Sequence, residues 1–170
     1  MNTPDAAWEG RAAELWSTID DVGNMEFISR IDALAAELPP GSAVGLFERG
    51  AAQDSTGHSD VAVPLYRAAL YSGLSGLRRR RATIQMASSL RNLGDARQAA
   101  DLLSAELNEA SDELDGAVRA FLALALVDLG REHEAISISL TALAPYLPRY
   151  NRSLARYAKE LYTEAPLRVA

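Results

Sequence analysis

The chain has 170 residues, of which 48% are hydrophobic and 24% are charged, enough to fill the core of one globular or solenoid domain. Its 17 basic and 23 acidic residues give a net charge of −6, which provides no overall attraction to nucleic acid or to an anionic membrane surface. Because the chain has no cysteine, a disulfide-stapled scaffold and a cysteine-ligated metal site are excluded.

The sequence also lacks the patterns of membrane insertion and secretion. No stretch stays apolar for the ~18 residues that a membrane-spanning helix needs. The first residues have neither a basic segment nor an apolar segment of the kind found in secretory signals. The sequence therefore predicts a soluble, cytoplasmic protein with no membrane partner.

Four glycines divide the chain at nearly regular intervals. Gly23, Gly57, Gly94 and Gly130 are separated by 34, 37 and 36 residues, and each lies between two stretches with apolar residues at helical spacing. A period in this range is typical of helix pairs that bury their apolar faces only by stacking on neighbouring pairs. The chain is therefore predicted to be a repeat protein.

Residues 1–40 are predicted to form a degenerate first helix pair. One apolar stripe begins at Trp8 and ends at Gly23, because glycine suits the position just after a helix. A second stripe follows and is ended by Pro39 and Pro40, which cannot continue a helix.

Residues 43–72 and 79–109 are predicted to form the second and third helix pairs, each with a glycine turn in its middle. The serine- and glycine-rich residues 72–77 predict a flexible connector between these pairs. In the third pair, Asp95 and Gln98 have the spacing of a capping box at the start of the second helix.

Residues 113–147 are predicted to form the fourth pair, whose first helix is apolar almost all round and is expected to be the most buried element. Pro145 and Pro148 mark the end of this pair. Residues 149–164 are predicted to form a capping helix with one polar face. The sequence thus predicts an all-α fold, a single α-solenoid domain over residues 1–170 with about four antiparallel helix pairs and a C-terminal capping helix.

The turns and the small residues near them resemble those of the tetratricopeptide repeat family. Three turns, VGN, LGD and LGR, are similar to the family's turn between paired helices. The family's small residue five positions after the turn glycine corresponds to Ala62, Ala99 and Ala135. Its small residue seven positions before that glycine corresponds to Gly50, Ala87 and Ala123.

Two parts of the chain depart from the family pattern. A later small position reads Ala69 and Ala142 in two pairs but Glu106 in the third, which predicts a second helix that is rotated or shortened near its end. The first pair matches loosely, because Trp16 and Ile28 occupy its small positions.

Over roughly residues 40 to 163 the chain resembles the bacterial tetratricopeptide repeat group 5 family. The resemblance implies a non-catalytic scaffold that binds a protein or peptide in a concave groove lined by the first helix of each pair. The groove positions correspond to Arg81, Gln85, Ser88, Arg91, Asn92, Phe121 and Asp128. Arginine forms paired, charge-assisted hydrogen bonds with carboxylates, so an acidic partner suits Arg81 and Arg91 with Asn92.

Two alternatives to an open groove remain. The capping helix or a second copy of the chain fills the groove, as in a self-associating structural module or a homodimer. In the other alternative, Arg81 and Arg91 pair with Glu48, Asp54 or Asp128 on neighbouring first helices.

A basic patch formed by Arg78, Arg79 and Arg80 precedes Arg81 at the predicted start of a helix, where cations oppose the positive end of the helix dipole. Such a patch attracts an anionic partner, whether an acidic protein, a nucleic-acid phosphate or the acidic residues 101–115 of the chain itself. We favour the simpler interpretation, a solvated turn, because exposed charges usually contribute under ~1 kcal/mol. Nucleic acid is the least favoured partner because no aromatic residues are interleaved with the cations.

The sequence contains no motif for catalysis or for a cofactor. The phosphate-binding GxxxxGK loop, the GxGxxG turn, the GxSxG elbow and the HExxH pair are all absent. The two histidines, His58 and His133, each follow an inter-helix glycine and are expected in turns too far apart to share a metal. The sequence therefore predicts no catalytic residue, no cofactor and no metal, and it favours a protein- or peptide-binding adaptor over an enzyme.

Overall fold

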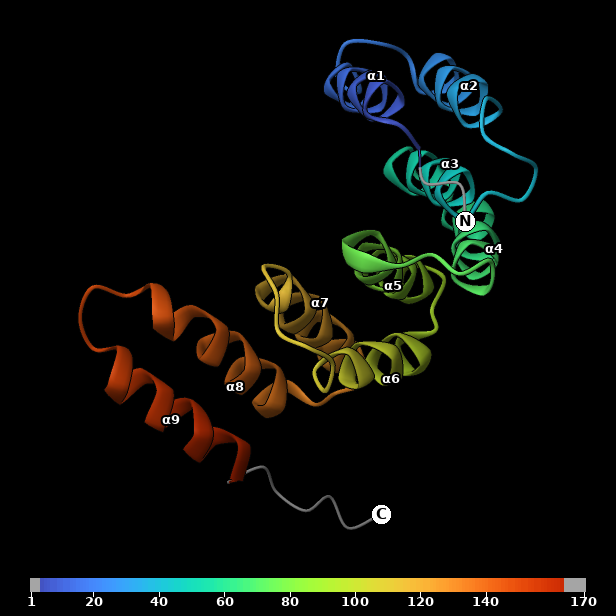
Figure 1. The fold of residues 1–170 in the computed structure, drawn as a ribbon. Helices are drawn as coiled ribbons and strands as arrows, with labels where there is room; N and C mark the ends of the chain where they lie inside the picture. The colour runs from blue at the N-terminus through green and yellow to red at the C-terminus, as the bar shows by residue number, and fades with distance from the viewer. Residues whose placement is uncertain (1–3, 164–170) are drawn as a thin grey trace. The chain divides into compact units, whose positions relative to one another are not determined.

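The computed structural model describes residues 4–163. This part of the chain consists of helices and connectors and contains no strand. The helices are α1 (Ala6–Ser17), α2 (Asn24–Ala35), α3 (Ala43–Ser55), α4 (Ser59–Tyr71), α5 (Gly76–Asn92), α6 (Ala96–Glu106), α7 (Asp115–Asp128), α8 (Glu132–Leu143), the 3₁₀ turn η1 (Ala144–Tyr146) and α9 (Asn151–Thr163). Short connectors join each helix to the next (Figure 1). The prediction of an all-α helical repeat is confirmed over this part of the chain.

The chain divides into two compact units, Met1–Ser89 and Leu90–Ala170, and the boundary falls inside α5. The predicted helix pairs correspond to successive helices, and the predicted capping helix, residues 149–164, corresponds to α9. Residue 164 and residues 1–3 of the predicted first pair lie outside the described residues. The single solenoid domain over residues 1–170 stays a prediction.

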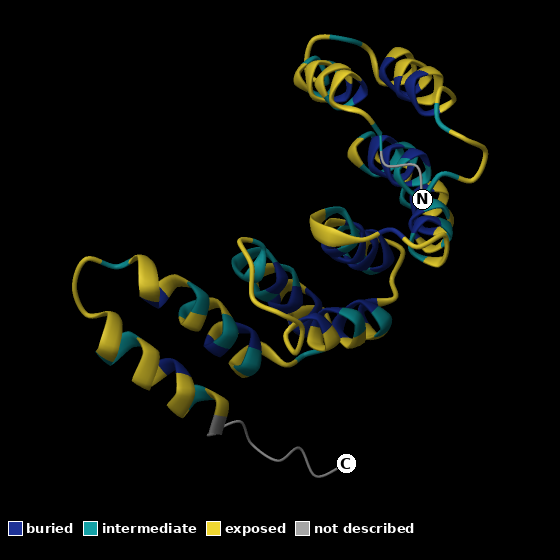
Figure 2. Cartoon of the chain, viewed as in Figure 1, coloured by how far each residue is buried: buried dark blue, intermediate teal, exposed yellow. Residues whose placement is uncertain are grey.

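Large aromatic side chains fill the core of the first unit. Phe27, Phe47 and Tyr66 have no exposed surface. Trp16 meets Phe27 edge to face, with ring centroids 5.1 Å apart, a favourable geometry for aromatic pairs. Trp8 is 3% exposed and packs in a cluster with Leu34, which agrees with the amphipathic pattern of the first helices. Figure 2 shows buried and exposed residues on different faces of these helices.

Smaller aliphatic side chains fill the core of the second unit, where α6 packs on α7, α7 on α8 and α8 on α9. Val118 and Leu122 of α7 are buried, whereas Leu124 is 45% and Val127 is 49% exposed. The expectation that this helix is the most buried element is therefore wrong. Apolar residues occur on every face of this helix, but its neighbours cover only some of those faces. The apolar side chains on the uncovered faces stay exposed.

Three of the four turn glycines have the backbone conformation that the sequence predicts. The φ angles are +89° at Gly57, +91° at Gly94 and +68° at Gly130, a region that favours glycine because it has no Cβ. The residue after each glycine donates its N–H to a carbonyl five residues earlier: His58 to Gln53, Asp95 to Leu90 and Arg131 to Leu126, at 2.8 to 2.9 Å. These bonds satisfy the last carbonyls of α3, α5 and α7.

Gly23 does not end a helix, contrary to the prediction. Helix α1 ends at Ser17, and Gly23 is the N-cap of α2 with φ −67°. Ile19 and Val22, in the connector, still pack against the buried cluster of the first unit. The apolar pattern therefore continues past the end of the helix, which explains why the sequence places that end too late.

The small residues at the helix crossings are tightly packed. Ala62 and Ala99 have no exposed surface. At Gly50, where α3 meets α4, an added Cβ would lie 3.0 Å from the Tyr66 ring and 3.3 Å from Cβ of Leu65. Only glycine fits there without displacing a neighbour.

Helix α6 ends at Glu106, the residue that interrupts the small-residue pattern. Its side chain is buried, with 5% of the residue exposed. The second helix of the third pair is thus short, one of the two outcomes that the sequence predicts. Its start is capped as expected, because Gln98 donates its N–H to Oδ1 of Asp95 at 3.0 Å.

Candidate functional site

The predicted groove residues lie on α5 and α7. Arg81, Gln85 and Ser88 belong to the part of α5 in the first unit and have the spacing of one helix face. Arg91, Asn92, Phe121 and Asp128 belong to the second unit. Arg81, Asn92 and Asp128 are exposed, and the other four are half-buried.

In the second unit the structure pairs two of these residues with each other. Nε of Arg91 lies 2.6 Å from Oδ2 of Asp128, and its Nη2 donates to Oδ1 at 3.3 Å. This is one of the pairings that the sequence left open. The charge of Arg91 is thus already balanced within the chain.

In the first unit Arg81 has no such partner. Its guanidinium carbon lies 5.2 Å from the centroid of the Phe47 ring, a cation–π contact that holds the head group in place. Within residues 4–163 no carboxylate forms an ion pair with Arg81. The pairing of Arg81 with Glu48 or Asp54, left open by the sequence, is therefore absent from the described residues.

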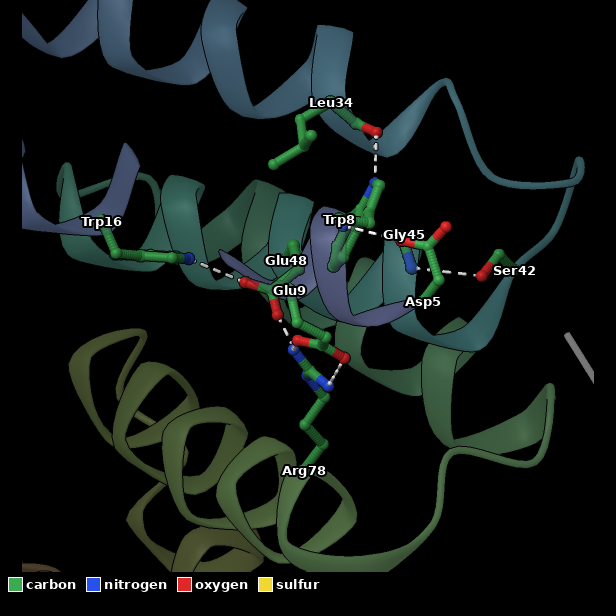
Figure 3. Close-up of polar contacts among 9 residues, drawn as sticks. All are labelled: Asp5, Trp8, Glu9, Trp16, Leu34, Ser42, Gly45, Glu48 and Arg78. Carbon is green, nitrogen blue, oxygen red and sulfur yellow. Dashed lines mark hydrogen bonds and ion pairs between the residues drawn. The ribbon is translucent and has the colours of Figure 1, made fainter. Parts of the chain in front are cut away.

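Glu48 instead accepts hydrogen bonds from two other side chains (Figure 3). Glu48 is 3% exposed, and its Oε2 accepts from Nε1 of Trp16 at 2.7 Å. Its Oε1 accepts from Nε of Arg78 at 3.0 Å. A buried carboxylate needs such partners, because an unpaired charge is costly away from water.

Arg78 links three helices of the first unit. Its Nη1 and Nη2 donate to the two carboxylate oxygens of Glu9 at 2.8 and 2.6 Å, while its Nε donates to Glu48. The paired hydrogen bonds from Arg78 lower the pKa of Glu9, and the bond to Glu9 raises the pKa of Arg78. Arg78 therefore ties α1 and α3 to α5.

The expectation of a solvated turn is wrong for Arg78. Helix α5 begins at Gly76, so the basic residues lie inside its first two turns. Arg80 is 4% exposed and Arg79 is half-buried. The acids that pair with Arg78 lie 30 and 69 residues earlier in the chain, so no local pattern in the sequence indicates them. A role of Arg79 and Arg80 in binding a partner stays a prediction.

A half-buried acid, Asp54, joins α3 to α4 and α5. It accepts from Oγ of Ser89 at 2.6 Å and from the hydroxyl of Tyr66 at 3.3 Å. Burial raises the pKa of Asp54, and the two hydrogen bonds partly oppose that shift. Burial also raises the pKa of Tyr66. The sequence left Asp54 open as a partner of an arginine, whereas its bonds to Ser89 and Tyr66 were not predicted. The signal that could have indicated them is an acid on the apolar side of a helix.

A pocket of about 610 Å³ opens in the first unit. It is lined by the connector before α3, by the connector before α5 and by the first turns of these two helices. Of the lining residues that the structure describes, Arg78 and Arg81 are the charged ones. No pattern in the sequence predicts this pocket, since its walls come together only when the connectors are folded.

Among the described residues, no group of acidic and histidine side chains is arranged to hold a metal ion. None of the helices between residues 4 and 163 is long and apolar enough to cross a membrane. His58 and His133 are both exposed. His58 lies in its turn as the N-cap of α4, but His133 lies in the first turn of α8, contrary to the expectation of a turn position.

The paired helices, glycine turns and small crossing residues define a helical-repeat protein. The family model described as "Tetratrico peptide repeat" matches residues 43–161, well over half of the chain, and the protein belongs to the tetratricopeptide repeat family, in its group 5. Members of this family generally act as non-catalytic scaffolds for protein–protein interaction. No curated protein and no solved structure matches the chain.

Proposed function

We propose that the protein is a non-catalytic adaptor that binds a protein or peptide in the groove lined by the first helices of its repeats. The observation that carries this proposal is the family match over residues 43–161. An acidic partner, a cytoplasmic location and the absence of catalysis are parts of the proposal that rest on the sequence.

The face of α5 in the first unit supports a polar contact with the partner. The Oε1 atom of Gln85 is buried and accepts no hydrogen bond within the described residues. An unsatisfied buried acceptor is costly, so a rotation of the Gln85 side chain that lets Oε1 accept a peptide N–H from a bound chain would be favourable. Arg81, which forms no ion pair with any residue that the structure describes, adds a cation near the same helix face.

The second unit supports a smaller contribution from Arg91. Its guanidinium already binds Asp128, so a partner's carboxylate must replace that acid. Phe121, half-buried on α7, offers an apolar contact. We therefore assign the main polar contacts of the adaptor to Arg81 and Gln85.

The test is a pull-down from extract of the cells that produce the protein, with the full chain as bait and mass spectrometry as readout. A double variant, Arg81→Ser with Gln85→Ala, is compared with the control Arg30→Ser. Arg30 pairs with Glu26 on the exposed side of α2, so the control removes a cation without touching α5. The proposal expects a partner that is lost with the double variant and retained with the control. Equal recovery of the partner with the double variant and with the control contradicts binding at Arg81 and Gln85.

A second candidate function is self-association. Four large aliphatic residues of the second unit are 45 to 50% exposed: Leu124, Val127, Ile136 and Leu143. Exposed apolar residues of this kind are common at contacts between copies of a chain. Light scattering over a range of concentrations tests this candidate. A dimer that Leu124→Ser with Ile136→Ser reduces to a monomer supports it, and a monomer at every concentration removes it.

A further inference from the structure

The pocket of about 610 Å³ in the first unit has the size of a small-molecule site. Of the residues proposed for the groove, it includes only Arg81. Its lining comes from two connectors and the first two turns of the helices that follow them, so it is a local feature of the first unit.

The pocket combines apolar walls with a positive charge. Pro39, Pro40, Val44, Leu74 and Leu77 supply apolar surface. Leu74 is 7% exposed and Leu77 is 44% exposed, so apolar surface extends from the floor to the rim. None of the described lining residues carries a carboxylate side chain. A neutral ligand would leave the charge of the pocket unbalanced.

The two lining arginines differ in what remains available to a ligand. Arg78 uses Nε, Nη1 and Nη2 to bind Glu48 and Glu9, so its charge is balanced and it serves as a fixed wall. Arg81 forms no ion pair within the described residues, and its contact with the Phe47 ring fixes its position. Among the described residues that line the pocket, Arg81 is therefore the one cation without an ion pair.

Two helix starts add to this positive potential. Ser42, Ala43 and Val44 at the start of α3 line the pocket, as do Leu77 and Arg78 near the start of α5. The N-terminal end of a helix carries a partial positive charge, which favours an anion nearby.

We propose that this pocket binds a small organic monocarboxylate with an apolar body. The guanidinium of Arg81 binds the carboxylate through charge-assisted hydrogen bonds. The proline and leucine side chains of the walls contact the apolar body. One free cation matches one negative charge, and it matches a carboxylate better than a phosphate group of charge near −2. This site shares Arg81 with the proposed groove, but binding of a small acid requires no protein partner and is measured separately.

The test is calorimetric titration of the full-length protein with octanoate and with octanamide, which has the same apolar chain but no charge. Octanoate is expected to bind at least ~10-fold more tightly, because charged hydrogen bonds contribute about 1.5 kcal/mol or more. In Arg81→Gln this preference is expected to disappear. The control Arg30→Gln, outside the pocket, is expected to bind octanoate as the wild type does.

A second variant tests the cavity itself. Ser75 is exposed and lines the pocket, so Ser75→Phe fills the space while Arg81 stays in place. Octanoate binding is expected to be lost in this variant, with an unchanged helical circular dichroism spectrum.

Three results would overturn the proposal: no binding of octanoate to the wild type, equal binding by Arg81→Gln, or unchanged binding by Ser75→Phe. A trileucine peptide with a free carboxylate provides a further comparison. If it binds ~10-fold more tightly than octanoate, the site is a peptide site and the assignment to a small acid is wrong.

Discussion

The two units of this protein hold their helices together by different means. In the first unit, buried polar groups such as Glu48 connect helices through hydrogen bonds, beside fully buried aromatic rings. In the second unit, aliphatic side chains form most of the core beside the buried carboxylate of Glu106, and the ion pair between Arg91 and Asp128 is partly exposed. Breaking one buried polar contact costs a large part of the free energy of unfolding. In an aliphatic core the stabilisation is spread over many weak contacts, so each single contact contributes less. The first unit should therefore be the more sensitive to single polar substitutions.

The largest effect is expected for Glu48→Ala. The substitution leaves the indole N–H of Trp16 without its acceptor and removes one of the two acids that bind Arg78. Breaking a buried ion pair destabilises a protein by about 3 kcal/mol or more. Hydrogen exchange of peptides from α3 and α4 in the full chain measures the loss. Glu37→Ala, which breaks an exposed pair with Arg11, is the control and is expected to leave exchange unchanged.

A second, somewhat smaller effect is expected at the crossing of α3 and α4. Gly50→Ala forces a Cβ to within 3.0 Å of the Tyr66 ring and destabilises the first unit by about 1–3 kcal/mol. Its counterpart in the second unit is Ala123→Gly, which costs about 1 kcal/mol through helix propensity alone. Urea unfolding followed by circular dichroism gives both values. A stabilising Gly50→Ala, as in an uncrowded helix, would show that the first unit is no more tightly packed than the second.

A third substitution probes the second unit and is expected to have less effect. Asp128→Asn removes the charge that pairs with Arg91, and the two side chains are 35% and 29% exposed. Such pairs contribute about 0–1 kcal/mol, so urea unfolding should change little. If Asp128→Asn lowers the free energy of unfolding as much as Glu48→Ala does, the two units do not differ in their sensitivity to polar substitutions.

The smallest effect concerns pH. The hydrogen bonds from Arg78 lower the pKa of Glu9 in the folded state below its ordinary value of about 4.3. This group therefore adds stability above that pH, and the contribution is lost as the pH falls through the lowered pKa. Glu9→Gln should lose less stability than the wild type between about pH 5 and pH 3. The raised pKa of Asp54 has the opposite sign, because its ionisation costs stability as the pH rises.

A urea series at several pH values measures the Glu9 effect. Asp54→Asn in the same series separates the two carboxyl groups. If the free energy of unfolding depends on pH in the same way for the wild type and Glu9→Gln, the bonds between Arg78 and Glu9 do not favour the folded state.

Features that depend on neighbouring residues could be predicted from the sequence. Gly57, Gly94 and Gly130 end helices through backbone bonds that span six residues, and Ala62 and Ala99 lie at a fixed distance after those glycines. Both the turn conformation and the repeat interval are visible in the residue types and in their spacing along the sequence. The helical repeat and the turns at Gly57, Gly94 and Gly130 could therefore be predicted from the sequence.

Features that depend on distant residues could not be predicted. Arg78 meets Glu9 across 69 residues, and nothing near either residue distinguishes this pair from exposed charges. Gly23 resembles the other turn glycines in its spacing, but its φ is negative because α1 ends earlier at Ser17. The pocket beside Arg81 is built from connectors whose fold has no periodic signal.

The position of the indole rings has a practical consequence. Trp8 and Trp16 are the two tryptophans of the chain, and both lie on α1 in the first unit. Tryptophan fluorescence therefore reports on the unfolding of the first unit. Helices α6 to α9 of the second unit contain no tryptophan. Helical circular dichroism reports on all the helices at once. A midpoint that differs between the two signals would measure directly how independently the two halves of the chain unfold.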